Sequence, residues 1–124
     1  MHSKGIIPLC ALFAAILLVT ITPAMVKAHA PESVILFYNS ASQTLTVTVA
    51  HETSSPNTHY IKKIDIKKNG KPLESFSYDN QSDPSEISYS YKIPAKIGDK
   101  LEAFVSCSAH GSKSETLIIK KQLT

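Results

Sequence analysis

The sequence contains no tryptophan and no arginine, and it has only two cysteines and four glycines in 124 residues. A nucleic-acid-binding protein normally gathers lysine and arginine on one face or along one helix. Here the lysines alternate with acidic and apolar residues, as in a solvated strand surface. We therefore exclude nucleic acid as a partner.

The longest uncharged stretch, residues 5–26, lies between two lysines and consists mainly of isoleucine, leucine, alanine and valine. Such a segment is typical of a secretory signal peptide. Val26 and Ala28 occupy the −3 and −1 positions, where signal peptidase requires short residues. We therefore expect a signal peptide over residues 1–28 and a mature domain over residues 29–124 that begins with His29.

Two alternatives to this cleavage stay open. The uncharged stretch is long enough to span a bilayer, which takes about 20 residues, so an uncleaved segment would anchor the protein in the membrane. Cleavage after Ala30 also fits the small-residue pattern and would remove His29, although Pro31 at +1 disfavours it. In each case we expect an exported domain, in the periplasm or another extracytoplasmic compartment.

Removal of residues 1–28 changes both the charge and the cysteine content. Loss of Lys4 and Lys27 from the 13 lysines leaves 11 against 10 acidic residues, so the mature domain is nearly neutral. Cys10 is lost as well, and Cys107 is left without a partner for an internal disulfide. A lone cysteine in an oxidising compartment is a liability unless it is buried, paired with another chain or held as a metal thiolate.

From Ser33 onward, short runs with period-two alternation are separated by turn residues, and no segment has a helical period. This pattern predicts an all-β fold, an immunoglobulin-like β-sandwich of about seven antiparallel strands. Asn69-Gly70 can supply the positive φ angles of a tight hairpin turn. The predicted strands are Val34 to Tyr38, Thr44 to Ala50, Tyr60 to Lys67, Lys71 to Tyr78, Ile87 to Ile93, Lys100 to Cys107 and Glu115 to Lys120.

The histidines that remain after loss of His2 all lie at predicted strand ends or in loops. His51 closes the second predicted strand, His59 precedes the third, and His110 follows Cys107 at the spacing C-x-x-H. Imidazole and thiolate donors suit iron, copper, zinc or nickel, whereas calcium and magnesium require clustered carboxylates that these positions lack. The combination predicts a transition-metal site at one end of the sandwich.

The order of these residues resembles the iron centre of superoxide reductases, the desulfoferrodoxin and neelaredoxin family. The resemblance spans essentially the whole mature chain and includes every remaining histidine and the only remaining cysteine. The early histidine near a proline is His29 with Pro31, and the second histidine, about twenty residues on, is His51. The third histidine stands before Tyr-Ile, in His59-Tyr60-Ile61. The final C-x-x-H-G is Cys107-Ser108-Ala109-His110-Gly111.

The resemblance implies a mononuclear non-haem iron, Fe2+/Fe3+, with four equatorial imidazoles, an axial thiolate and an open sixth position. It implies a desulfoferrodoxin-like iron-binding domain that reduces superoxide to hydrogen peroxide and is re-reduced by an external electron donor protein. The chain has no C-x-x-C pair, so the additional rubredoxin-like domain of desulfoferrodoxin is absent. The implied metal ligands are His29, His51, His59, Cys107 and His110.

The chain departs from the family pattern at positions that bear on activity rather than on metal binding. The lysine that family members commonly carry before the first histidine is replaced by Ala28. The His-Pro-Met of the family is replaced by His51-Glu52-Thr53, and Lys62 or Lys63 stands where a tryptophan is usual. We therefore leave open whether the site turns over superoxide or has another redox role.

Other functions also fit the residues. A mature chain that starts at His29 would offer its amino group and imidazole to copper, as in a copper-binding or copper-carrier β-sandwich without catalysis. Both methionines, Met1 and Met25, lie in the N-terminal segment, so the usual axial ligand of a blue-copper site is missing. Zinc on three histidines and Cys107 would leave one histidine unexplained. A non-metal interaction module with surface histidines is the remaining alternative.

Overall fold

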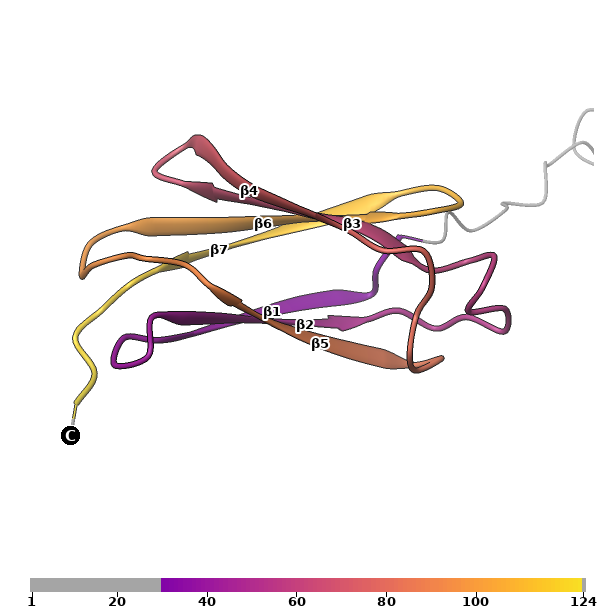
Figure 1. The fold of residues 1–124 in the computed structure, drawn as a ribbon, viewed down its shortest axis with the longest axis horizontal. Helices are drawn as coiled ribbons and strands as arrows, with labels where there is room; N and C mark the ends of the chain where they lie inside the picture. The colour runs from indigo at the N-terminus through magenta and orange to yellow at the C-terminus, as the bar shows by residue number, and fades with distance from the viewer. Residues whose placement is uncertain (1–29, 124) are drawn as a thin grey trace, which may run out of the picture.

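The computed structural model describes residues 30–123, and every regular element in that part of the chain is a β-strand (Figure 1). The strand bounds agree with the predicted ones to within one or two residues, except that the last strand begins three residues earlier than expected. The strands are β1 (Ser33–Asn39), β2 (Thr44–Ala50), β3 (Ile61–Lys68), β4 (Lys71–Ser77), β5 (Glu86–Lys92), β6 (Lys100–Cys107) and β7 (Ser112–Ile118).

The seven strands form two antiparallel sheets that pack face to face, which confirms the predicted all-β sandwich. One sheet has the order β1-β2-β5 and the other has the order β4-β3-β6-β7. Antibody constant domains place the fourth strand beside the fifth. Here β4 pairs with β3 instead, because the tight turn between them makes a local hairpin.

The core follows from the alternation of apolar residues along the strands. Leu45, Val47 and Val49 of β2 have no exposed surface, whereas the threonines between them reach the outer face of the sheet. Complete burial of such a side chain contributes about 1.5–3 kcal/mol relative to an exposed one. Strand β6 buries every second residue as well, and its buried line ends at Cys107.

The predicted hairpin turn at Asn69-Gly70 is confirmed. Asn69 and Gly70 have φ angles of 53° and 80°, as a two-residue turn with both central residues left-handed requires. The Asn69 side chain also donates to Asp99 and accepts a hydrogen bond from the Lys100 backbone. The β3–β4 hairpin is thereby joined to the start of β6, in the same sheet.

Strand β3 contains a register shift close to its beginning. Ile64 and Ile66 are buried, so strict alternation would also turn Lys62 inward. Instead the pairing with β6 slips between Ile61 and Lys63, and Ile61 becomes the buried residue, opposite Cys107. A bulge of this kind redirects the side chains that precede it.

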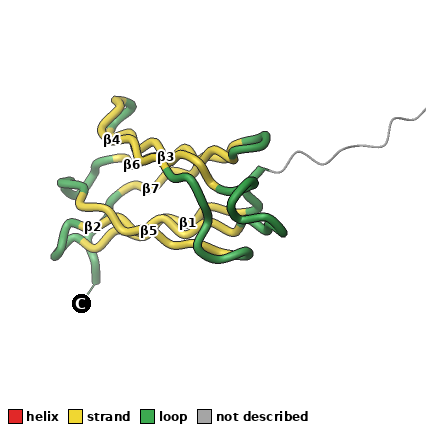
Figure 2. The backbone as a smooth tube through the Cα atoms, turned by 45° about the vertical axis from the view of Figure 1, so that its right-hand side comes forward, coloured by secondary structure: helices red, strands yellow, loops and turns green. Residues whose placement is uncertain are grey.

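Loops lie at both ends of the sandwich, and no helix is drawn among residues 30–123 (Figure 2). Within this part of the chain, no helix is long and apolar enough to cross a membrane. The segments after β2, before β3 and between β6 and β7 lie at the same end of the molecule as the start of β1 (Figure 1). The predicted site residues in the described part of the chain lie in these segments or, for Cys107, at the end of β6 where one of them begins.

Candidate metal centre

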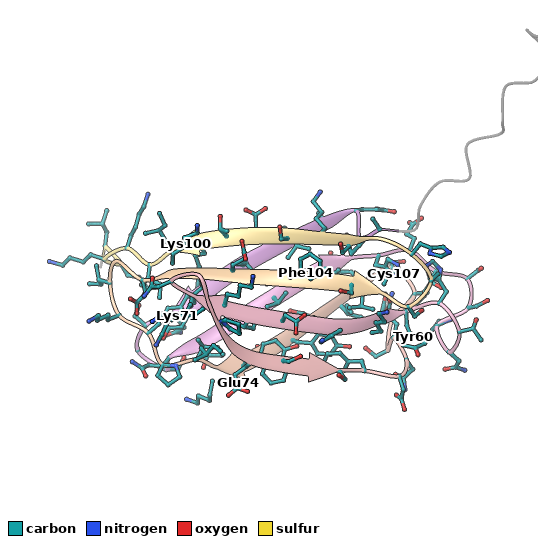
Figure 3. The ribbon with its side chains drawn as sticks, turned by 90° about the horizontal axis from the view of Figure 1, so that it is seen from above. Tyr60, Lys71, Glu74, Lys100, Phe104 and Cys107 are labelled. Carbon is teal, nitrogen blue, oxygen red and sulfur yellow. The ribbon has the colours of Figure 1, made fainter. Side chains whose placement is uncertain are left out.

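Cys107 and Tyr60 lie at one end of the sandwich, and Lys71 and Lys100 lie at the opposite end (Figure 3). Cys107 is the last residue of β6, and only 3% of its surface is exposed. Its backbone N–H donates to the carbonyl of Gly111 across the turn into β7. The thiol is therefore held at the edge of the core by the strand and by the turn that follows it.

His51 directly follows β2 and is 2% exposed. Its backbone N–H donates to the carbonyl of Ser85, which continues the β2–β5 pairing one step beyond the strand. Its ring Nδ1 lies 2.8 Å from the side-chain oxygen of Gln81, which is also buried. The ring is thus fixed by the strand on one side and by a buried amide on the other.

His59 is presented by a turn that begins at Ser55. The carbonyl of Ser55 accepts hydrogen bonds from the backbone N–H groups of Thr58 and His59, at 3.0 and 2.8 Å. Pro56 suits the first position of such a turn, because its ring fixes φ near −65°. The turn and the bulge in β3 together direct His59 toward the buried end of β6.

These three side chains form one group of candidate metal ligands. The ligand atoms of His51, His59 and Cys107 all lie within 4.8 Å of one another. His59 Nε2 lies 3.0 Å from the sulfur of Cys107, and the two imidazole rings meet edge to face with centroids 4.7 Å apart. Two imidazoles and one thiolate are a donor set for a transition metal.

Ser108 connects the segments that carry His59 and Cys107. Its hydroxyl donates to the carbonyl of Thr58 and accepts from the N–H of Tyr60, the two neighbours of His59. Its own N–H donates to the carbonyl of Tyr60 at 2.8 Å. Ser108 therefore fixes the distance between the third predicted ligand and the cysteine next to it.

An open hollow of about 540 Å³ lies beside His59. Glu32 and Glu52 are among the residues that line it, together with Thr53 and Ser85. None of the described residues that line it is a lysine. The hollow next to the candidate ligands is therefore acidic.

Asp83 lies in the same loop as Gln81, between β4 and β5. Its carboxylate accepts hydrogen bonds from the backbone N–H groups of Ser85 and Glu86, at 2.9 and 3.1 Å. The hydrogen bond from Ser85, and to a smaller extent the one from Glu86, holds the pKa of Asp83 below its ordinary value. The ionised carboxylate thus stabilises the loop between β4 and β5.

We expect the loop to lose this stabilisation in acid. A carboxyl group with a lowered pKa stabilises the folded state fully above its unfolded pKa, which is about 3.9, and ceases to do so as the pH falls through its folded pKa. Urea unfolding between pH 6 and pH 3 should therefore show a smaller loss of stability in Asp83→Asn than in the unchanged protein. Asp79→Asn, in the same loop, is the control and should follow the unchanged protein. Parallel curves for all three proteins would contradict the assignment.

Of the four predicted ligands in the described part of the chain, the structure brings three together. His110 is exposed, lies in the bend after β6, and does not belong to the group of three. His29 lies outside the described residues. The next residue, Ala30, lies so close to Gly111 that a β-carbon on this glycine would be 2.8 Å from the Ala30 side chain. The five-ligand assignment therefore stays a prediction.

Sequence reasoning did not single out Gln81 or Ser108. Both are polar residues in loops, and nothing in their spacing sets them apart from other loop residues. A weak indication exists for Ser108, because it stands next to the cysteine of the C-x-x-H pattern. Their partners, at residues 51, 58 and 60, become visible only once the strands are paired.

Fold and site together define a seven-stranded β-sandwich with a histidine- and cysteine-lined candidate metal centre at one end. No protein-family model and no curated protein matches the chain. The solved structures similar to it include superoxide reductases, some of them also described as neelaredoxins. The protein from Nanoarchaeum equitans is 18% identical, with a TM-score of 0.42 over 73% of this chain and 93% of that one.

The neelaredoxin from Ignicoccus hospitalis is 18% identical, with a TM-score of 0.45 over 75% of this chain and 82% of that one. The reduced neelaredoxin from Archaeoglobus fulgidus is 15% identical, with a TM-score of 0.44 over 77% of this chain and 93% of that one. These identities and TM-scores are low. The functional argument therefore rests on the residues of the site.

Proposed function

We propose that this chain is an exported protein that binds one iron ion and reduces superoxide to hydrogen peroxide. One observation carries the proposal: the ligand atoms of His51, His59 and Cys107 converge to within 4.8 Å at one end of the sandwich. The ordered pattern of histidines and cysteine, which resembles that of superoxide reductases, supports iron as the occupant.

The closest pair of donor atoms, on His59 and Cys107, fits adjacent positions on a single ion. Histidine nitrogens bind zinc at about 2.0–2.1 Å and thiolate sulfur binds it at about 2.3 Å, so on an ion of similar size neighbouring ligands at right angles lie about 3.1 Å apart. The observed separation between His59 Nε2 and Cys107 Sγ is 3.0 Å. The two side chains can therefore occupy adjacent positions on one ion without moving apart.

His29 and His110 would complete the ligand set. His110 lies three residues after Cys107, in the bend that leads into Gly111. Ala30, the first described residue, packs against Gly111 at this bend. This placement supports His29 and His110 as ligands from the two segments that meet there.

The protein residues would divide the chemistry between them. Bound iron supplies a one-electron couple, which an external electron donor protein restores after each turnover. Bound as a thiolate, Cys107 would donate electron density to the iron and tune its reduction potential. The hollow beside His59 gives a small molecule access from solvent, and its two glutamates, Glu32 and Glu52, oppose the approach of an anion.

One preparation tests the proposal. Protein exported from cells is expected to begin at His29 and to contain close to one iron per chain, measured by intact mass and by metal analysis. Superoxide is expected to oxidise the ferrous protein, with one electron and two protons converting each superoxide to one hydrogen peroxide. Because the hollow is acidic, the rate measured by pulse radiolysis should rise with ionic strength as the repulsion is screened.

Four results would contradict parts of the proposal. Copper in stoichiometric amount without iron would exclude the iron assignment. Iron without oxidation by superoxide would exclude superoxide reduction and leave an electron-transfer or sensor role. A mature chain that begins at Pro31 would lack the first ligand, and retention of residues 1–28 would make the protein membrane-anchored.

Copper is the second candidate, and the observed group itself favours it. Two histidines and one cysteine are the three strong ligands of blue-copper electron carriers. The described part of the chain contains no methionine to serve as the weak axial ligand. Copper loading that produces an intense visible thiolate band, with a copper affinity that does not depend on His29 or His110, would support this copper-carrier function over superoxide reduction.

A further inference from the structure

Gln81 is a buried side chain whose polar atoms all have partners. It is 3% exposed and lies in the loop between β4 and β5. Its amide nitrogen lies 2.7 Å from the carbonyl oxygen of His51 and 2.9 Å from that of Asp83. Its amide oxygen lies 3.3 Å from the backbone nitrogen of Ile61 and 2.8 Å from His51 Nδ1.

These partners determine which end of the amide faces the imidazole. Carbonyl oxygens only accept hydrogen bonds, so the atom that faces two of them must be the NH₂ group. The backbone N–H of Ile61 only donates, so the atom that faces it must be the amide oxygen. The atom that meets His51 Nδ1 is this same oxygen, and it only accepts.

The histidine must therefore supply the proton. In a neutral imidazole one nitrogen carries the hydrogen and the other carries the lone pair. If Nδ1 donates to Gln81, the lone pair of His51 lies on Nε2. Histidine ligands of metals commonly donate their other N–H to an oxygen in this way, which fixes both the tautomer and the plane of the ring.

We propose that Gln81 is a positioning residue that holds His51 as the Nδ1–H tautomer and so makes Nε2 the metal-binding nitrogen. This inference rests on the proposed metal-binding function of His51. It assigns to the β4–β5 loop a role that none of the five predicted ligands reveals. The loop contributes no predicted ligand, but it determines which ring nitrogen of His51 carries the lone pair that binds a metal.

Gln81 also joins the segments around the site. Its backbone N–H donates to the carbonyl of Pro56, in the turn that presents His59, at 3.1 Å. Its side chain meets the segment after β2 through His51 and the start of β3 through Ile61. One residue thus connects the segments that carry two of the candidate ligands, so its orientation is set by the folded protein and is independent of a bound ion.

The tautomer can be measured in the metal-free protein. At a pH where the ring is neutral, the nitrogen-15 shifts of His51 are expected to show Nδ1 protonated and Nε2 unprotonated. Gln81→Glu retains an acceptor for Nδ1–H and, with its other oxygen protonated to donate to one of the two carbonyls, should preserve this tautomer. Gln81→Met has a similar length and no acceptor, so the Nε2–H tautomer should gain population. Gln122→Met, at an exposed glutamine that bonds the carbonyl of Tyr38, is the matched control and should change nothing.

Metal affinity gives the second readout. Loss of a hydrogen-bond partner of this kind lowers metal affinity about 10–100-fold, so Gln81→Met should bind its metal that much more weakly than the unchanged protein. Gln81→Glu should be affected less. An unprotonated Nδ1 in the unchanged protein, or an unchanged tautomer in a folded Gln81→Met, would overturn the proposal.

The unchanged protein and Gln81→Glu decide the matter even if Gln81→Met does not fold. The tautomer measurement and the test of the proposed function can also fail independently of each other. If His51 shows the expected tautomers but the unchanged protein binds no iron, the iron assignment fails. The orientation of His51 by Gln81 then still stands.

Discussion

Cys107→Ser is expected to abolish the visible thiolate-to-iron charge-transfer band of the oxidised protein and to lower iron affinity by more than about 100-fold. The band requires a sulfur ligand, and a serine hydroxyl is a much weaker donor at neutral pH. The estimate is a lower limit, because loss of an outer-shell partner alone costs about 10–100-fold. Absorption spectroscopy of the iron-loaded protein and a competition titration with a chelator would measure the two effects.

The substitution isolates the ligand because serine nearly matches cysteine in size. Cys107 is 3% exposed at the end of the buried line of β6, so a larger residue would disturb the core. Unfolding of the metal-free proteins by urea should therefore show a difference of only about 1 kcal/mol. A Cys107→Ser protein that keeps the band and its iron would exclude the thiolate from the site.

Gly111→Ala is expected to displace the segment that leads from residue 29 into the domain. Gly111 has a φ angle of 92°, where any other residue is strained by about 1–2 kcal/mol. An added β-carbon would also lie 2.9 Å from the backbone of Ala30, closer than nonbonded atoms approach. If His29 is a ligand, the variant should bind iron at least about 10-fold more weakly, by chelator competition.

Gly98→Ala is the matched control for this experiment. Gly98 has almost the same φ angle, 93°, but a β-carbon there would meet no atom within 4 Å. It lies in the turn before β6, at the end of the sandwich opposite Cys107. Both variants should lose similar stability to backbone strain, and only Gly111→Ala should lose iron affinity. Equal affinities would argue against His29 as a ligand.

The fold was predictable because its determinants are local. Period-two alternation in β2 and β6 depends only on the pleat of a strand, and Asn69-Gly70 specifies its turn through two residues. The bounds of β7 were less predictable. This edge strand is largely exposed, so its sequence carries little alternation, and its start at Ser112 is set by pairing with β6.

The candidate site was predictable in its residue types but not in its geometry. Histidines at strand ends and one remaining cysteine indicate a transition metal before any strand is paired. The convergence of His59 with Cys107 depends on the register shift after Ile61, which no local pattern announces. From the alternation of Ile64 and Ile66 alone, His59 would be placed on the outer side.

The sequence by itself determined an all-β chain with a small set of imidazole and thiolate donors, because composition and strand periodicity are properties of neighbouring residues. Only the tertiary structure decided that His51, His59 and Cys107 meet, and that Gln81 and Ser108 hold them. The contact of Gln81 with His51 joins residues 30 positions apart in the chain, and that of His59 with Cys107 joins residues 48 positions apart. Such contacts arise from sheet pairing, loop path and one bulge acting together, and each of these depends on burial of the whole core.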